Sequence, residues 1–90
     1  MLFVIIGHDG PRGAELRPAI RPAHLAYLRP YLERGKIVLA GPFTDGSGSL
    51  LIVDMDSESE ALAFAQADPY AINAVFERVE VKPFRKVFPE

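Results

Sequence analysis

The chain is organised around Arg21-Pro22-Ala23-His24-Leu25-Ala26-Tyr27-Leu28, where a proline opens a helix that carries a histidine. Proline suits the first position of a helix, where its missing N–H costs no hydrogen bond and its fixed φ already matches the helix. The sequence therefore predicts a helix over residues 22–34 that continues through Pro30 with a local kink and ends at Gly35. His24 lies at the border of the apolar stripe of this helix, half-sheltered, and the stripe consists of Leu25, Leu28 and Leu32.

Composition bounds the size and the partners of the protein. The 90 residues make one domain, residues 1–90, with 49% hydrophobic residues, so some apolar surface is expected to meet a second subunit. Ten basic and 12 acidic residues give a net charge of −2 without a basic stripe, so we expect neither a nucleic-acid nor a membrane partner. The absence of cysteine and of a basic, cleavable leader favours a cytoplasmic protein.

Three apolar runs predict the first strands of a sheet. Residues 2–6 form a continuous run rich in β-branched and aromatic side chains, which is typical of a strand buried on both faces. Residues 36–40 and 49–54 flank a Gly- and Ser-rich turn at 44–48, which favours an antiparallel hairpin. This turn lacks the lysine of a phosphate-binding loop and is not placed between a strand and a helix, so we favour a plain turn.

Glycine and proline divide the rest of the chain. Residues 9–19 contain several of both and predict a loop, whereas 75–81 predict a strand. Pro83 is expected to interrupt that strand before a short fifth strand at 84–88.

A capping box predicts the start of the second helix. In Ser57-Glu58-Ser59-Glu60 the serine hydroxyl can accept the N–H of Glu60, and the Glu60 carboxylate can reach back to the N–H of Ser57. The helix is expected to end near Asp68, because Pro69 disfavours a helical conformation in the residue before it.

The order β-α-β-β-α-β is the ferredoxin-like plan, an α+β fold with an antiparallel sheet and both helices on one face. Strands 2–6 and 49–54 are expected to be central. The other face of the sheet is apolar and uncovered, which predicts a homodimer with twofold symmetry. The helical residues expected to pack on the sheet are Leu25, Leu28, Leu32, Leu62 and Phe64.

His24 and Asp68 are predicted to lie within hydrogen-bond reach, because the start of the first helix and the end of the second meet at one edge of the sheet. A carboxylate fixes which imidazole nitrogen carries the proton and supports the imidazolium, as a general base needs. The positive end of the first helix is expected to keep His24 neutral. Asp68 also suits an N-cap for a helical turn that begins at Pro69, so one of its oxygens could cap while the other accepts from the imidazole.

The same concave site is expected to expose Tyr70 and the turn formed by Gly41 and Pro42, with Tyr27 as a further aromatic wall for a small ligand. His8, at the end of the first strand, has no spaced partner and is interpreted as an ordinary strand residue. No cysteine is present and no carboxylate stands at ligand spacing from His24, so we expect neither a metal nor another cofactor.

Four segments resemble signature segments of the YciI-like, or YCII-related, family. They are Arg21-Pro22-Ala23-His24-Leu25, Ala40-Gly41-Pro42, Ala67-Asp68-Pro69-Tyr70 and Val81-Lys82-Pro83-Phe84, in the order of the family and across nearly the whole chain. The resemblance implies a ferredoxin-like fold assembled as a dimeric α+β barrel, with a His–Asp pair in a cleft, here His24 and Asp68. It also implies likeness in fold to muconolactone isomerases and, for some members, dehydrochlorination of a chlorinated hydroxyquinol.

Two classes of function are compatible with these residues. The first is an acid/base lyase or isomerase that acts on a small cyclic or aromatic organic acid, with His24 as the base and Asp68 as the residue that orients it. The second is a non-catalytic binding or accessory module, in which the pair only ties the two helices together. A lone half-buried histidine is more often a packed, hydrogen-bonded residue than a site, which favours the second class until a partner for His24 is found.

Overall fold

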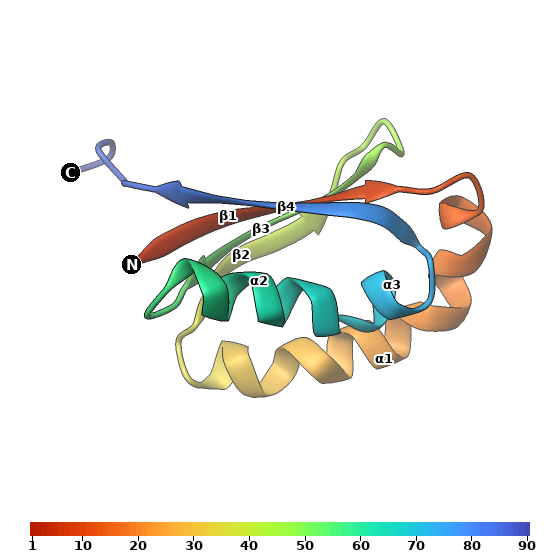
Figure 1. Ribbon diagram of the computed structural model, residues 1–90, viewed down its shortest axis with the longest axis horizontal. Coiled ribbons are helices and arrows are strands. Elements are labelled where there is room, and N and C mark those ends of the chain that lie inside the picture. The colour runs from red at the N-terminus through yellow and green to blue at the C-terminus, as the bar shows by residue number, and fades with distance from the viewer.

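The computed structural model describes residues 1–90 and shows a four-stranded antiparallel sheet with the helices on one face (Figure 1). The strand order is β2-β3-β1-β4, with β1 and β3 in the centre as predicted. This is the ferredoxin-like arrangement, and it confirms the predicted α+β fold. The elements in chain order are β1 (Leu2–Asp9), α1 (Gly13–Glu33), β2 (Ile37–Pro42), β3 (Gly48–Asp54), α2 (Glu58–Ala67), α3 (Pro69–Ile72) and β4 (Phe76–Phe84).

The core fills the layer between the sheet and the helices. Alternate residues of the two central strands point into it, so that Phe3 stands opposite Val53 and Ile5 opposite Leu51. None of these four side chains is more than 2% exposed. The helices close the layer with Leu28, Ala61, Phe64 and Ala65.

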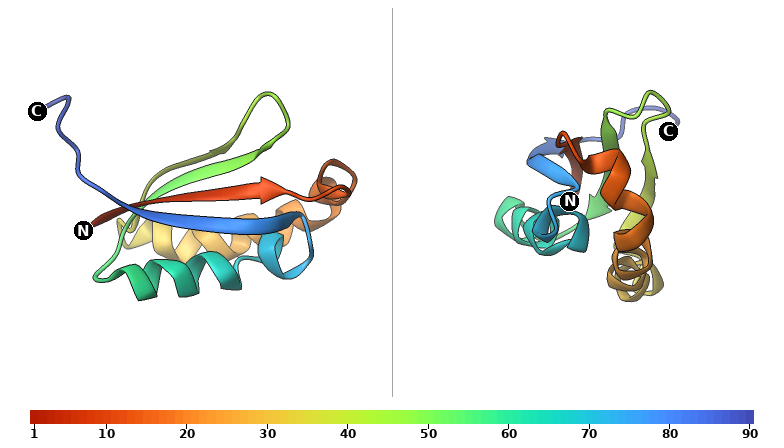
Figure 2. Two further views of the ribbon diagram at one scale, coloured as in Figure 1. Left: turned by 45° about the horizontal axis from the view of Figure 1, so that its top comes forward. Right: turned by 90° about the vertical axis from the view of Figure 1, so that its right-hand side faces the viewer.

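Helix α1 begins at Gly13, so the predicted loop over residues 9–19 and the predicted start at Pro22 were wrong. Leu16 and Ile20 of the added turns pack against a small cluster of Tyr70, Val75 and Phe76. This tertiary packing outweighs the helix-breaking tendency of the prolines. The helix bends in its N-terminal part (Figure 2).

The three prolines inside α1 are tolerated because the carbonyl groups that lose a hydrogen bond belong to exposed residues. Pro18, Pro22 and Pro30 lack an N–H, which leaves the carbonyls of Ala14, Pro18 and Ala26 without a helical partner. All of these residues are exposed, so water can solvate the freed carbonyls. Neither α1 nor any other helix combines the length and the apolarity that a membrane span requires.

Three of the five predicted core residues on the helices were wrong. Leu25, Leu32 and Leu62 are 44%, 51% and 39% exposed, whereas Leu28 and Phe64 are buried as predicted. The cause is the docking of α2 on the tyrosine side of α1. Tyr27 and Tyr31 pack on Phe64, with ring centroids 5.3 and 4.6 Å away, and this turns Leu25 and Leu32 toward solvent beside β2.

Helix α2 begins with the predicted cap, because Oγ of Ser57 accepts the N–H of Glu60 at 3.1 Å. The Glu60 carboxylate, however, accepts from the N–H of Asp56 at 3.3 Å, one residue before the expected donor. The helix ends at Asp68, whose φ of −60° and ψ of 132° are extended, as the following proline demands.

Strand β4 is continuous through Pro83, so the predicted break and fifth strand at 84–88 were wrong. Pro83 stands opposite Phe3 of β1, and β4 is an edge strand of the sheet. A proline is tolerated on an edge strand when its nitrogen lies on the open side, because no ladder bond is then lost. After Phe84 the chain leaves the sheet, and residues 85–90 extend away from the body (Figure 1).

Two glycines offer a matched test of the sheet. A Cβ at Gly48 would overlap the carbonyl oxygen of Gly7 on the neighbouring strand, whereas a Cβ at Gly41 would meet nothing within 4 Å. We expect Gly48→Ala to lower the free energy of unfolding by about 2 kcal/mol or more, because the pairing of β1 with β3 must shift. Gly41→Ala should change it by less than about 0.5 kcal/mol. Urea unfolding followed by circular dichroism measures both, and equal losses would contradict the expectation.

Candidate active site

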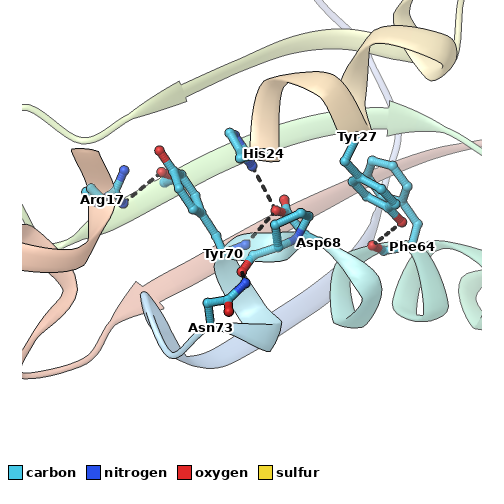
Figure 3. A network of polar contacts seen from close by, with 9 residues as sticks. Arg17, His24, Tyr27, Phe64, Asp68, Tyr70 and Asn73 are labelled. Carbon is cyan, nitrogen blue, oxygen red and sulfur yellow. Dashed lines mark hydrogen bonds and ion pairs between the residues drawn. The ribbon is translucent and has the colours of Figure 1, made fainter. Parts of the chain in front are cut away.

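His24 and Asp68 form a buried pair that joins α1 to the junction of α2 and α3 (Figure 3). Nδ1 of His24 lies 2.8 Å from Oδ1 of Asp68, and the two residues are 8% and 2% exposed. The predicted contact is therefore present, while the catalytic role of the pair stays a prediction. We expected one oxygen of Asp68 to cap the helical turn and the other to accept from the imidazole. In the structure one oxygen does both, because the same Oδ1 also accepts the N–H of Tyr70 at 2.9 Å and so caps α3.

The Asp68 contact decides which nitrogen of His24 is free to act as a base. An ionised carboxylate only accepts hydrogen bonds, so the proton of a neutral His24 lies on Nδ1. Nε2 then carries the lone pair and has no hydrogen-bond partner within the protein. This is the tautomer that a general base needs, with the second nitrogen oriented by a carboxylate.

The Tyr70 ring fixes the plane of the imidazole. It stacks on His24 with centroids 3.9 Å apart and only 6° between the planes, and Tyr70 is 3% exposed. Burial raises the pKa of the Tyr70 phenol, against the opposing charges of Arg17 and Arg21, so the hydroxyl stays protonated near neutral pH.

The expected influence of a helix N-terminus on His24 was wrong. His24 follows Gly13, the first residue of α1, by three turns, and the field of a helix end is confined to its first turn. The surroundings of His24 are set by Asp68 and Tyr70 instead.

A cavity of about 150 Å³ opens beside His24, between α1 and the hairpin of β2 and β3. Tyr70, Gly41 and Pro42 line it together with His24, so the structure brings together the residues that we expected around the histidine. The other lining residues are Arg17, Arg21, Leu25, Leu28, Ala40, Ser49 and Leu51.

Tyr27 lies elsewhere. Its hydroxyl donates to the carbonyl of Phe64 at 2.9 Å, and its ring stacks against the Phe64 ring between α1 and α2 (Figure 3). Burial raises the pKa of its phenol. The structure therefore places Tyr27 outside the lining of the His24 cavity.

Arg17 is the feature of the site that the sequence analysis missed. Its Nε and Nη2 donate to the two carboxylate oxygens of Asp9 at 2.9 and 2.7 Å, and Nη2 also donates to Oγ of Ser49 at 3.0 Å. Its guanidinium lies 5.1 Å from the centroid of the Tyr70 ring. The signal was present in the sequence, because Arg17, Arg21 and His24 stand at i, i+4 and i+7, but the predicted loop at 9–19 hid it.

His8 lies outside this cavity. Its Nε2 contacts the Glu80 carboxylate of β4, and this hydrogen bond lowers the pKa of Glu80. His8 is therefore a paired strand residue, whose partner the sequence did not reveal.

The fold and the site define a class of protein: a small ferredoxin-like α+β domain with a buried histidine–carboxylate pair at the wall of one cavity. Residues 1–85 match the model of the YCII-related domain. The chain belongs to the YCII-related family.

Two relatives support this assignment over the full length. The protein YciI of Escherichia coli O6:H1 is 40% identical over 98 residues, which cover 98% of this chain and all of that protein. A protein of Haemophilus influenzae is 35% identical over 101 residues, again with 98% and 100% coverage.

A solved structure is also similar, the 5-chloro-2-hydroxyhydroquinone dehydrochlorinase of Burkholderia phenoliruptrix AC1100 in complex with 2,5-dihydroxybenzoquinone. It is 32% identical with a TM-score of 0.81, and the match covers 94% of each chain.

Asp68 offers a test of the bonds that hold the pair. Asp68→Ala removes the cap of α3, worth about 1 kcal/mol, and leaves Nδ1 of His24 buried without an acceptor, so we expect a loss of unfolding free energy of about 2–4 kcal/mol. Asp68→Asn keeps an acceptor for both donors and should lose less than about 1 kcal/mol.

The matched control is Ser57→Ala, which removes only the cap of α2 and should lose about 1 kcal/mol. Urea unfolding measures all three variants. If Asp68→Ala and Ser57→Ala lose the same amount, the contact with His24 contributes nothing to stability.

Proposed function

We propose that the protein is an acid/base enzyme, a lyase or isomerase that acts on a small cyclic or aromatic organic acid. The observation that carries the proposal is the His24–Asp68 pair, with Nδ1 bonded to a carboxylate and Nε2 free at the wall of a cavity. A histidine held in that way is suited to remove a proton from a bound substrate.

The proposed step begins with a substrate in the cavity and a proton within reach of Nε2. His24 takes the proton, the electron pair left behind forms a double bond, and a leaving group such as chloride departs with its own bonding pair. In an isomerisation the same proton returns to a different carbon. Asp68 stabilises the imidazolium in both cases, and Tyr70 keeps the ring in one plane while the charge develops.

The structural neighbour supports the substrate class. It is a dehydrochlorinase of a chlorinated hydroxyhydroquinone and was solved with a dihydroxylated benzoquinone, so a chain of this fold at 32% identity acts on a small hydroxylated ring. A cavity of about 150 Å³ with apolar walls from Leu25, Leu28 and Leu51 suits one such ring.

We also propose that the protein works as a homodimer through the open face of the sheet. The residues that alternate with the core side chains of β1 and β3 point to this face and are apolar and half-buried, although no helix covers them (Figure 2). They are Leu2, Val4, Ile6, Leu50 and Ile52. Twofold packing of this face on a second copy would remove the apolar surface from water.

The catalytic proposal is tested by chloride release from 5-chloro-2-hydroxyhydroquinone and by exchange of ring protons for deuterium in a panel of hydroxylated aromatic acids. We expect His24→Gln and Asp68→Asn to lower kcat/KM by about 10²- to 10⁴-fold, because each removes the oriented base. Tyr27→Phe loses only the bond to Phe64 and should keep the wild-type rate.

Unchanged turnover in His24→Gln would end the catalytic proposal. A loss of stability in that variant, without exchange or turnover in the wild-type protein for any compound, would favour the non-catalytic module.

The dimer is tested by light scattering. We expect a mass of twice the 9.9 kDa of one chain at micromolar concentration. Val4→Asp should give the monomer mass, because it places a charge in the centre of the proposed contact, whereas Val38→Asp, on the exposed part of β2 beside α1, should leave the dimer intact. A monomeric wild-type protein would contradict the proposal.

A further inference from the structure

The guanidinium of Arg17 is held in place by hydrogen bonds that do not involve all of its N–H donors. Of its five N–H donors, the one on Nε and the two on Nη2 bond to Asp9 and Ser49. The two donors on Nη1 are not used by Asp9 or Ser49, and the Tyr70 hydroxyl, which hydrogen-bonds to Arg17, occupies at most one of them. Arg17 lines the His24 cavity, so a remaining Nη1 donor is available to a ligand there.

Arg21 adds an unpaired cation one helical turn further along. It lines the same cavity, is exposed and forms no ion pair with any side chain. The cavity lining contains two arginines and no carboxylate, and Asp9 neutralises only Arg17. Arg21 therefore places an unpaired positive charge at the cavity, while the Asp68 carboxylate lies behind His24 and is not part of the lining.

Ser49 contributes a further donor. The residue is 4% exposed, and its oxygen accepts from Arg17, so its own O–H is not engaged in that bond. Oriented N–H and O–H donors on a fixed scaffold favour an anion over the water that it displaces.

We propose that Arg21, Nη1 of Arg17 and the hydroxyl of Ser49 form an anion subsite, which holds a negatively charged oxygen group of the substrate while His24 acts on another atom of the same ring. The proposal rests on the proposed function and specifies its substrate class, a ring compound that carries a carboxylate or an ionised hydroxyl. Arg21 and Arg17 precede His24 by about one and two turns of the same helix, and all three residues line one cavity. A ring bound in this cavity would present its charged group to the arginines and its reacting atom to His24, which makes Arg21 and Arg17 determinants of specificity.

The test is a calorimetric titration with two charged probes and an uncharged control. The charged probes are gentisate, a dihydroxylated benzoate, and 2,5-dihydroxybenzoquinone, whose hydroxyls ionise readily. The control is gentisamide, which has the shape of gentisate without its charge. We expect the wild-type protein to bind gentisate or the quinone at least about tenfold more tightly than gentisamide.

Arg21→Gln is the main variant, because Arg21 is exposed and its loss should not impair folding. It should raise the Kd of the charged probe by about tenfold and leave that of gentisamide unchanged. Arg29→Gln is the matched control, because it removes one arginine from the same helix outside the His24 cavity and should change neither Kd.

An effect of Arg21→Gln on gentisate alone would assign the subsite to carboxylates, and an effect on the quinone alone would assign it to ionised hydroxyls. Equal effects of Arg21→Gln and Arg29→Gln would overturn the subsite, as would a wild-type protein that binds neither anion.

Asp68→Asn separates the subsite from the catalytic proposal. It should keep the Kd of the charged probe, because the anion subsite does not include Asp68, while it loses turnover. A wild-type rate in Asp68→Asn would count against the base and not against the subsite.

Discussion

Oδ1 of Asp68 accepts hydrogen bonds from two elements at once, Nδ1 of His24 in α1 and the N–H of Tyr70 in α3. The position of this single atom is set by Pro69, which forces Asp68 out of the helical conformation and ends α2. Because Tyr70 also stacks on His24, the same few atoms fix both the edge and the plane of the imidazole. The same contacts therefore form the wall of the cavity and join the three helices.

The parts of the fold that could be predicted are those that depend on local pattern. The continuous apolar run of β1 and the Gly-rich turn of the hairpin each specify one outcome, and the sheet follows from their order. The extent of α1 could not be predicted, because Pro18 and Pro22 argue for a break and only contacts of Leu16 and Ile20 with Val75 and Phe76, distant in sequence, overcome it. For the same reason the exposed positions of Leu25 and Leu32 depend on where α2 docks and not on the helical period.

The site could be predicted in its centre and not at its rim. His24 and Asp68 stand next to prolines that fix the local backbone, and the fold plan brings them together whatever the details of packing. The position of Arg17 depends on the unexpected first turns of α1, and its partner Asp9 lies at the end of a strand, where the sequence shows no pairing signal. Arg17 and Arg21 could therefore not be placed at the cavity from residue spacing, because both lie before the predicted start of the helix.

The three prolines of α1 make this helix dependent on its tertiary contacts. An interior proline disfavours a helix by about 3 kcal/mol relative to alanine, so the 21-residue segment could not hold its helical form alone. Its helical form therefore depends on the packing of Leu16 and Ile20 against the cluster of Tyr70, Val75 and Phe76. Arg17, Arg21 and His24 line one cavity only because they share one face of this helix. The cavity beside His24 thus owes its shape to contacts made by Leu16 and Ile20, two residues that do not line it.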